Sequence, residues 1–145
     1  MGGSPAGLAE AAVLSATGCA VRVEERVLSF GRKLLKAGRG GLNISHSEAP
    51  EALLARYGAA APWLAPALAE WTTQDIRDWM AGLGQASFIG SSGRVFPTVM
   101  KASPLLRAWL ERLRHQGVAL HTRIDWTGWN QHGHPTFAPM QTGGT

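Results

Sequence analysis

The chain has 145 residues, of which 45% are hydrophobic and 17% charged, and its formal net charge is +4. This length predicts one domain with a sizeable core, since a chain of this size buries about 68–70% of its unfolded surface. The single cysteine excludes a disulfide scaffold and a cysteine-based zinc site. No uncharged run reaches the ~20 apolar residues of a membrane helix, and no basic residue precedes the first apolar stretch as in a signal peptide. We therefore expect a cytoplasmic protein.

The first 25 residues predict a glycine turn, a helix and a strand, in that order. Pro5 suits the first turn of the helix, because its missing N–H costs nothing there, and Gly18 is a suitable stop. Apolar and polar residues alternate over 19–25, which favours a strand. Cys19 lies at the helix–strand junction and is expected to be buried as a small hydrophobe.

The middle of the chain predicts a glycine-rich basic stretch followed by helices. Over residues 30–46 a short helical turn is expected to give way to irregular backbone, because glycines cluster there. Residues 88–96 are expected to form a glycine- and serine-rich connection. Helices are expected over 51–57, over 63–70 with an interruption at Pro66, from Thr72 with Asp75 as its capping-box partner, and from Ser103 to Gly117.

The C-terminal part predicts two strands, over 118–129 and 136–140, around a turn at Gly133. Histidines flank that turn, but His132 and His134 fall short of a full metal-ligand set, so no metal site is expected. The six tryptophans lie on amphipathic faces, and the core is their expected place.

The N-terminal turn is a candidate dinucleotide-binding motif. In such a turn the first glycine allows the tight bend, the second lets a pyrophosphate approach the backbone, and the third allows close packing. Here these positions are Gly2, Ser4 and Gly7, so a serine side chain stands where the phosphate would approach. Glu25 follows at the end of the predicted strand, where an acid would accept hydrogen bonds from a ribose. An ordinary glycine-rich N-terminus and a solvated strand-end charge remain the alternatives.

Several blocks of the chain, taken in order, resemble the BaiN-like or aminoacetone-oxidase-like NAD(P)/FAD-dependent flavoproteins. The resemblance covers essentially the whole chain, and the block at 31–46 is its most specific part. It implies an α/β fold, namely an incomplete Rossmann-like FAD-binding domain with a glycine turn–helix–strand unit, a helical insert and a C-terminal strand pair. The blocks are residues 2–8, 21–26, 31–46 and 92–97, followed by Lys101 and Ala102.

The resemblance implies FAD as the cofactor and leaves NAD(P)H open as an electron donor in complete relatives. Backbone N–H groups in a glycine-rich turn beside Arg and Lys suit an anion, although a basic solvated loop is the alternative. Leu42 stands where many relatives carry cysteine, which argues against a redox thiol there. The implied contacts are Gly2, Ser4 and Gly7 at the pyrophosphate, Glu25 at the ribose, and Arg32, Lys33, Gly38, Arg39, Gly40, Gly41 and Asn43 towards the flavin.

Members of this family are much longer, so the resemblance predicts that the chain is a fragment. Within one partial FAD-binding domain we expect a dinucleotide-binding segment at 1–46, a helical segment at 47–116 and a strand pair at 117–145. The strand that should precede Gly2 and the substrate-side domain are expected to be absent. The expected function is the FAD-binding portion of a flavin-dependent (NAD(P)/FAD) oxidoreductase, without catalytic competence on its own. Catalytic residues, substrate and oligomeric state stay open.

Two other functions are compatible with the sequence. Fourteen Lys and Arg against ten Asp and Glu permit a small basic nucleic-acid-binding protein. The basic residues are spread along the chain apart from a cluster at 32–39, however, and no nucleic-acid motif accompanies them. The remaining alternative is a gene fragment without autonomous activity, since half a cofactor domain exposes unpaired strand edges.

Overall fold

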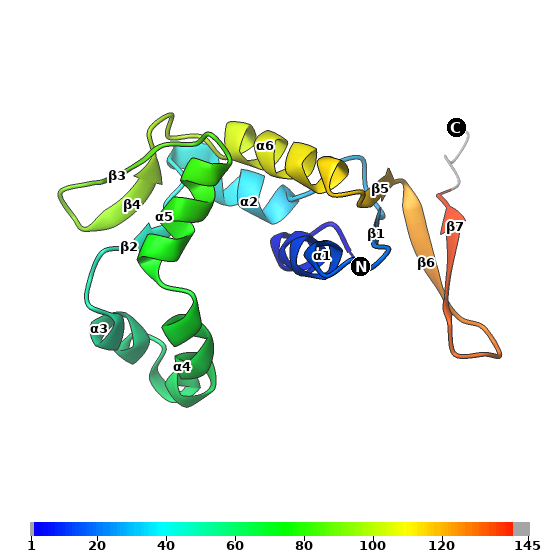
Figure 1. The fold of residues 1–145 in the computed structure, drawn as a ribbon, viewed down its shortest axis with the longest axis horizontal. Helices are drawn as coiled ribbons and strands as arrows, with labels where there is room; N and C mark the ends of the chain where they lie inside the picture. The colour runs from blue at the N-terminus through cyan, green and yellow to red at the C-terminus, as the bar shows by residue number, and fades with distance from the viewer. Residues whose placement is uncertain (1, 141–145) are drawn as a thin grey trace. The chain divides into compact units, whose positions relative to one another are not determined.

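The computed structural model describes residues 2–140, and Figure 1 follows the chain from the blue N-terminal helix to the red C-terminal strand. Met1 and residues 141–145, the outer ends of the expected segments 1–46 and 117–145, lie outside the described residues. The chain divides into two compact units, one formed by residues 1–36 with 109–145 and the other by residues 37–108. Within residues 2–140, no helix has both the length and the apolar character needed to cross a membrane.

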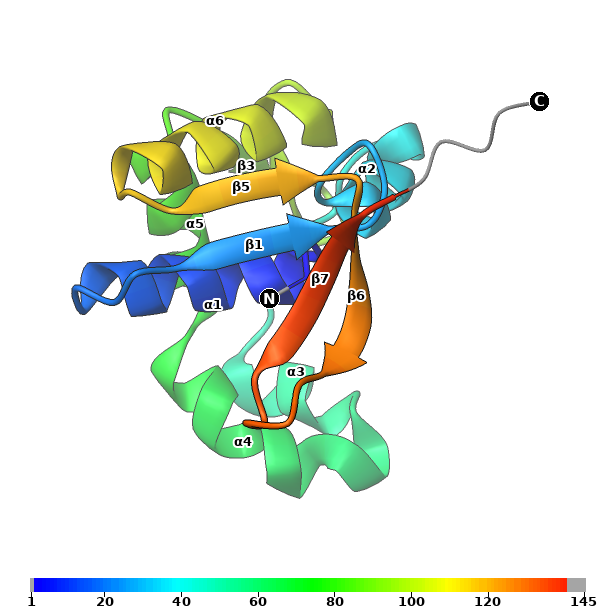
Figure 2. The same cartoon turned by 90° about the vertical axis from the view of Figure 1, so that its right-hand side faces the viewer.

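The first unit is built on a pair of parallel strands. β1 (Arg22–Glu25) pairs with β5 (Ala119–Thr122), and α1 (Pro5–Ala16) packs against β1. Figure 2 shows the two strands pointing the same way with α1 running alongside β1. Leu8 and Val23 are fully buried, so the apolar face of α1 and the centre of β1 supply the core of this unit.

The positions predicted for Pro5, in the first turn of α1, and for Gly18, just after its end, are confirmed. Ser4 is the N-cap and Pro5 the first helical residue, while Thr17 caps the C-terminus and Gly18 follows with φ of 84°. The expectation for Cys19 is wrong, because its side chain is exposed. Since β1 begins only at Arg22, Cys19 lies in the loop that precedes the strand and is not part of it.

The single strand expected over 118–129 is in fact two strands. β5 ends at Thr122, and β6 (Ile124–Trp129) begins after Arg123, whose φ of 59° turns the chain out of the extended conformation. β5 pairs with β1, whereas β6 pairs with β7 (Pro135–Pro139) in an antiparallel hairpin. One run of strand-forming residues therefore serves two sheets. The turn at Gly133, with φ of 73°, is where the sequence predicts it.

The second unit combines a three-stranded antiparallel sheet with helices. Its strand order is β2 (Ser45–His46), β4 (Arg94–Pro97) and β3 (Ser87–Ile89). The connection expected over 88–96 is therefore wrong: β3 and β4 form a hairpin, in which Phe88 lies opposite Phe96. The helical elements are α3 (Pro50–Ala55), α4 (Ala61–Glu70), α5 (Thr73–Gly82) and the 3₁₀ turns η1 (Gly38–Gly40) and η2 (Gly58–Ala60).

The helix expected to be interrupted at Pro66 is continuous, since α4 runs from Ala61 to Glu70. Pro66 cannot donate to the carbonyl of Pro62. Both prolines are exposed, so water can solvate that carbonyl and the helix tolerates the missing bond. The sequence predicts a break because proline usually disrupts a helix interior, but on this exposed helix the lost hydrogen bond does not end the helix.

Two helices, α2 (Arg32–Ala37) and α6 (Ala102–His115), contain the unit boundaries. The amphipathic pattern predicted for α6 is confirmed, and its buried large side chains are Leu105, Leu106, Trp109 and Leu113. The core placement expected for all the tryptophans is wrong, because several of them are more than half exposed. These are Trp63, Trp71, Trp126 and Trp129.

The capping box predicted at the start of α5 is present. The Asp75 N–H donates to Thr72 Oγ1, and the Thr72 N–H donates to Asp75 Oδ2 at 2.7 Å. The Thr72 hydroxyl also donates to Asp75 Oδ2, and this bond, followed by the one from the Thr72 N–H, lowers the pKa of the Asp75 carboxyl below its ordinary value of 3.8. The box therefore stabilises α5 most when Asp75 is ionised.

Replacing Thr72 with alanine is expected to lower the free energy of unfolding by about 1 kcal/mol at about pH 7, since an N-cap is lost. The folded state lowers the pKa of Asp75, so this stabilisation is present above pH 3.8 and is lost as pH falls through the folded pKa. The difference between wild type and Thr72→Ala should therefore shrink on acidification. Urea unfolding followed by circular dichroism measures it, with the exposed Thr98→Ala as the control. A difference that stays constant down to about pH 2 contradicts the coupling.

Candidate functional site

The N-terminal glycine turn is held from both sides at Gly3. Its N–H donates to Glu25 Oε2 at 3.1 Å, and its carbonyl accepts from the Gly31 N–H at 2.7 Å. Gly31 has φ of 62°, a conformation that glycine adopts without strain. The turn is therefore fastened to the end of β1 and to the residue that precedes α2.

Steric contacts explain why the turn needs glycine at two positions. A Cβ on Gly3 would lie 2.5 Å from Phe30 Cδ1 and 2.6 Å from Glu25 Oε2. On Gly7 it would lie 2.0 Å from the carbonyl oxygen of Gly2. A Cβ on Gly2 itself would meet nothing within 4 Å. The inner side of the turn is thus filled at Gly3 and Gly7, whereas the backbone at Gly2 is open.

The carboxylate of Glu25 spans the turn and its own strand end. Oε2 accepts from the Gly3 N–H, and Oε1 accepts from the Val27 N–H, each at 3.1 Å. A carboxylate oxygen has two lone pairs, so each oxygen can still accept a further hydrogen bond. The structure brings Glu25 and the glycine turn together, as a ribose-binding acid requires, while the cofactor role of these residues stays a prediction.

Ser4, at the middle position of the candidate motif, has a defined local role. Its Oγ accepts from the Gly7 N–H at 3.3 Å and so caps α1. That N–H is one of the donors that a helix N-terminus offers to an anion. The serine hydroxyl therefore occupies a position that a phosphate oxygen would take.

The two basic residues predicted near the cofactor lie at the start of α2. Arg32 and Lys33 directly follow Gly31 and are both exposed. Their position relative to the glycine turn is set by the Gly31–Gly3 hydrogen bond. They place positive charge next to Gly31, the residue that is hydrogen-bonded to the turn.

The predicted loop at 38–43 belongs to the second unit. Gly38 is buried, and a Cβ there would lie 2.6 Å from the Ala102 Cβ. Gly41 has φ of 113°, so a side chain at this position would be strained. Arg39, Gly40 and Asn43 are exposed. The glycines at 38 and 41 therefore shape the loop, and its exposed members are the ones that can meet a ligand.

Leu42 anchors the same loop. It is 2% exposed, and its N–H donates to the Met100 carbonyl at 3.3 Å. Leu42 is thus part of the hydrophobic core.

Sequence reasoning missed Gly3 and Gly31 as members of the site. The doublet Gly2–Gly3 was a signal for the first, since two successive glycines allow the close approach of another segment. Gly31 carried no comparable signal, because its bond to Gly3 joins residues 28 positions apart. Among residues 2–140, no group of three or more His, Cys, Asp or Glu side chains is arranged to hold a metal ion.

The sequence matches the family model described as the HI0933-like protein Rossmann domain over residues 1–143. The chain belongs to this HI0933-like family. A search of curated proteins finds no match. Among solved structures, the HI0933-like chain is similar to the crystal structure of Thermovibrio ammonificans THI4, with a TM-score of 0.54 and 18% identity. The similarity covers 94% of this chain and 43% of that one, so the chain spans less than half of the THI4 chain.

These comparisons confirm the expected fold class, an α/β Rossmann-type fold. They do not favour the nucleic-acid alternative, and the structure pairs several basic side chains of this HI0933-like chain with acids. Arg22 meets Glu24 at 2.6 Å, and Arg26 meets Asp125 at 3.5 Å. Part of the positive charge is therefore compensated within the fold.

Proposed function

We propose that this chain is the FAD-binding portion of a flavin-dependent oxidoreductase. The observation that carries the proposal is the hydrogen bond between the Gly3 N–H and Glu25 Oε2, which couples the glycine turn to the acid at the end of β1. In this arrangement the turn and the N-terminus of α1 lie at the pyrophosphate, and Glu25 accepts hydrogen bonds from the ribose hydroxyls. Membership of the HI0933-like family supports the same proposal.

The residues of the first unit fit such a group. The backbone at Gly2 is open, so no side chain would block a diphosphate there, and the inner side of the turn is already filled at Gly3 and Gly7. Glu25 retains acceptor capacity on both oxygens. Ser4 is the one departure, because its hydroxyl holds the Gly7 N–H.

The proposal assigns a role to each exposed basic or polar residue that the resemblance singled out. Arg32 and Lys33 supply positive charge for the diphosphate, and Asn43 offers a donor and an acceptor to a flavin edge. Arg39 and the backbone of residues 38–41 line the cofactor's path towards the flavin. When bound, FAD supplies the hydride or electron transfer itself. Membership of the BaiN-like or aminoacetone-oxidase-like group, with NAD(P)H as the electron donor, is the finer form of this proposal.

The direct test is a flavin titration of the full chain. We expect the protein to retain FAD through gel filtration and to show flavin absorbance between about 350 and 500 nm, a property of the cofactor. Circular dichroism establishes in parallel that the chain is folded. A folded chain that retains no FAD would overturn the proposal.

Replacing Ser4 with glycine is expected to tighten FAD binding. The change frees the Gly7 N–H for a phosphate oxygen, and glycine is itself an acceptable N-cap, so stability should fall by only a few tenths of a kcal/mol. Equilibrium dialysis measures the dissociation constant, which we expect to fall about threefold to tenfold, in line with one charge-assisted hydrogen bond.

Ser4→Ala is the matched variant for this experiment. It also frees the N–H but keeps a Cβ and removes the cap, so it should lose about 1 kcal/mol of stability. If Ser4→Gly binds FAD more weakly than wild type, the hydroxyl contributes to the site rather than competing with the phosphate.

A further inference from the structure

The second unit contains a pocket that the proposed FAD contacts leave unexplained. Its volume is about 460 Å³, within the range of small-molecule sites, and its lining residues all lie between Asn43 and Ile76. Of the residues assigned to FAD, only Asn43 reaches it. The pocket belongs to residues 37–108 and can be considered without the glycine turn.

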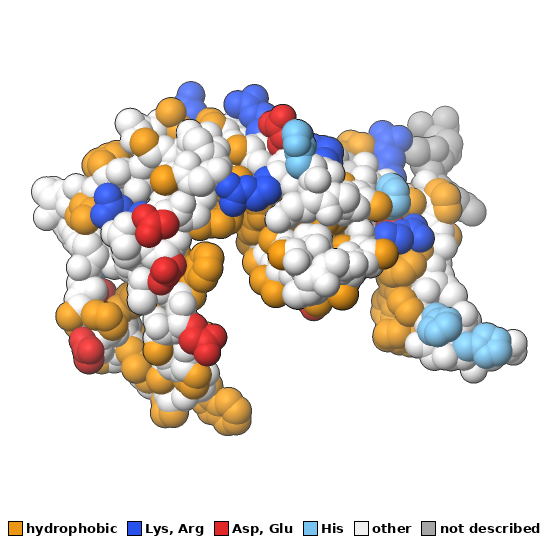
Figure 3. Space-filling model, viewed as in Figure 1, with side chains coloured by type: hydrophobic (Ala, Val, Ile, Leu, Met, Phe, Trp, Pro, Cys, Tyr) orange, Lys and Arg blue, Asp and Glu red, His pale blue; other side chains and the backbone are white. Residues whose placement is uncertain are grey.

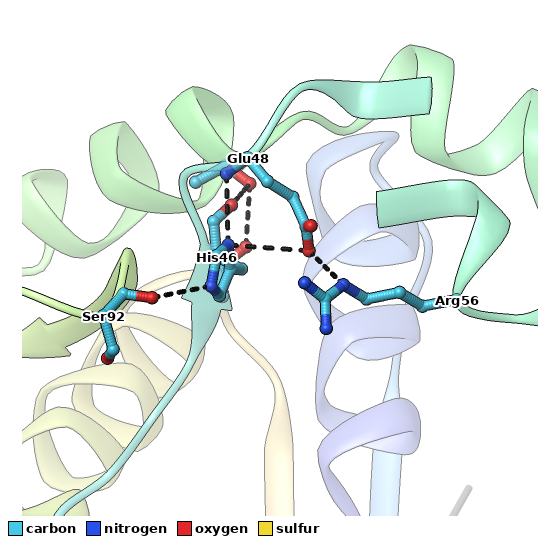
Figure 4. A network of polar contacts seen from close by, with 6 residues as sticks. His46, Glu48, Arg56 and Ser92 are labelled. Atoms are coloured by element: carbon cyan, nitrogen blue, oxygen red, sulfur yellow. Dashed lines mark hydrogen bonds and ion pairs between the residues drawn. The ribbon is translucent and has the colours of Figure 1, made fainter. Parts of the chain in front are cut away.

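Two of the lining residues, His46 and Glu48, belong to the polar network that Figure 4 shows. His46 Nε2 lies 3.0 Å from the Ser92 carbonyl, and its Nδ1 accepts from the Glu48 N–H at 3.1 Å. The carbonyl can only accept, so Nε2 carries the proton and Nδ1 is the acceptor. His46 is thereby fixed between two backbone groups and positions Glu48.

The carboxylate of Glu48 forms an ion pair with Arg56. Its Oε1 lies 2.6 Å from Arg56 Nε, and its side chain is only 15% exposed. The ion pair consumes part of the acceptor capacity of the carboxylate and leaves the rest to the pocket that Glu48 lines.

The hydroxyl groups of the same wall also present acceptors. Thr73 Oγ1 donates to the His46 carbonyl at 2.8 Å, so its own proton is used. The Ser45 Oγ, 2.8 Å from Thr73 Oγ1, must therefore be the donor of that pair. Ser45 is left with free lone pairs and no free proton. Together with Glu48, it makes a wall that accepts hydrogen bonds and does not donate them.

Away from the wall of Ser45 and Glu48, the lining combines apolar and aromatic side chains with the polar Asn43, Thr72 and Gln74. Leu53 and Leu68 line the pocket, and the rings of Tyr57 and Trp71 lie there while 46% and 52% exposed. Figure 3 shows hydrophobic side chains gathered over α3 and α4, the helices that carry these leucines. Exposed aromatic rings beside a pocket offer flat faces to a ring-shaped ligand.

We propose that this pocket binds a small ring-bearing molecule with one hydrogen-bond donor, either a hydroxyl or an amine. The donor faces Ser45 and Glu48, and the ring lies against Tyr57 and Trp71. The acceptor-only wall selects for the donor, because an apolar group at that wall would leave buried acceptors unpaired. The site does not depend on FAD binding, so its test stands apart from that of the proposed function.

The test uses three probes that share a phenyl ring with a two-carbon chain, namely 2-phenylethylamine, 2-phenylethanol and ethylbenzene, with the full chain. Saturation-transfer NMR measures their binding. We expect at least one of the two donors to bind about fivefold or more tightly than ethylbenzene, as one buried hydrogen bond allows. A preference for the amine or for the alcohol decides which donor the site takes. Equal binding of all three probes, no binding, or displacement of the probes by FAD would each overturn the proposal.

Two variants locate the binding. Leu53→Trp fills the pocket and should abolish probe binding, whereas Leu54→Trp, on the same helix but outside the lining, should leave it unchanged. Ser45→Ala should reduce the preference for the donor probe to about twofold or less while ethylbenzene is unaffected. If Leu53→Trp fails to fold, Ser45→Ala tests the proposed site on its own. Donor binding that survives all of these changes places the ligand elsewhere.

Discussion

Gly7→Ala is expected to destabilise the chain, although the same substitution in an ordinary helix stabilises by about 1 kcal/mol. The new Cβ would lie 2.0 Å from the Gly2 carbonyl oxygen, which is backbone and has no rotamer to adopt. The turn must open to admit it, and overpacking of this kind costs about 1–3 kcal/mol. Urea unfolding measures the change in the free energy of unfolding.

The control for this experiment lies in the same turn. A Cβ on Gly2 meets nothing within 4 Å, so Gly2→Ala should alter the free energy of unfolding by less than about 0.5 kcal/mol. Gly7→Ala should also weaken FAD binding if the turn holds the pyrophosphate, since the opened turn misplaces the N-terminus of α1. A Gly7→Ala chain as stable as wild type would show that the turn is not closed against Gly2.

Glu25→Gln is expected to weaken both the turn and the binding of FAD. Glutamine keeps the shape of the side chain, but its amide NH₂ must face one of the two backbone N–H groups that Glu25 now accepts, those of Gly3 and Val27. Hydrogen bonds to a charged group contribute about 1.5–3 kcal/mol. We therefore expect the dissociation constant of FAD to rise about tenfold or more, together with a lower melting temperature.

Glu10→Gln is the matched control, because it removes the same charge from an exposed position on α1. It should change neither quantity beyond about 0.5 kcal/mol. The two readouts separate the roles of Glu25. Loss of stability with unchanged FAD affinity would assign Glu25 to fastening the turn and remove it from the ribose. Unchanged stability would contradict the hydrogen bonds that span the turn.

Elements whose signals are local agree with the sequence. Pro5 and Gly18 delimit α1, and Thr72 with Asp75 starts α5, because caps depend on residues within one helical turn of each other. The turn at Gly133 follows from the preference of glycine for positive φ.

Elements whose limits depend on residues far apart in the sequence differ from the sequence-based predictions. The break between β5 and β6 falls at Arg123, a residue type that rarely adopts positive φ, and it exists because β5 pairs with β1 while β6 pairs with β7. The hairpin of β3 and β4 was hidden in a glycine-rich stretch, since its pairing depends on register rather than on composition.

The sequence by itself determined that this protein has a glycine-rich turn before a helix and an acid at the end of the next strand. It also contains the sequence blocks that indicate its family. Only the tertiary structure decided that Gly3 joins that turn to Glu25 and to Gly31, and that Ser45 and Glu48 form an acceptor wall in a separate pocket. The physical reason is the range of the interactions. Caps and turns are set by neighbours in the chain, whereas these contacts join residues 22 to 28 positions apart and exist only once the chain has folded back on itself.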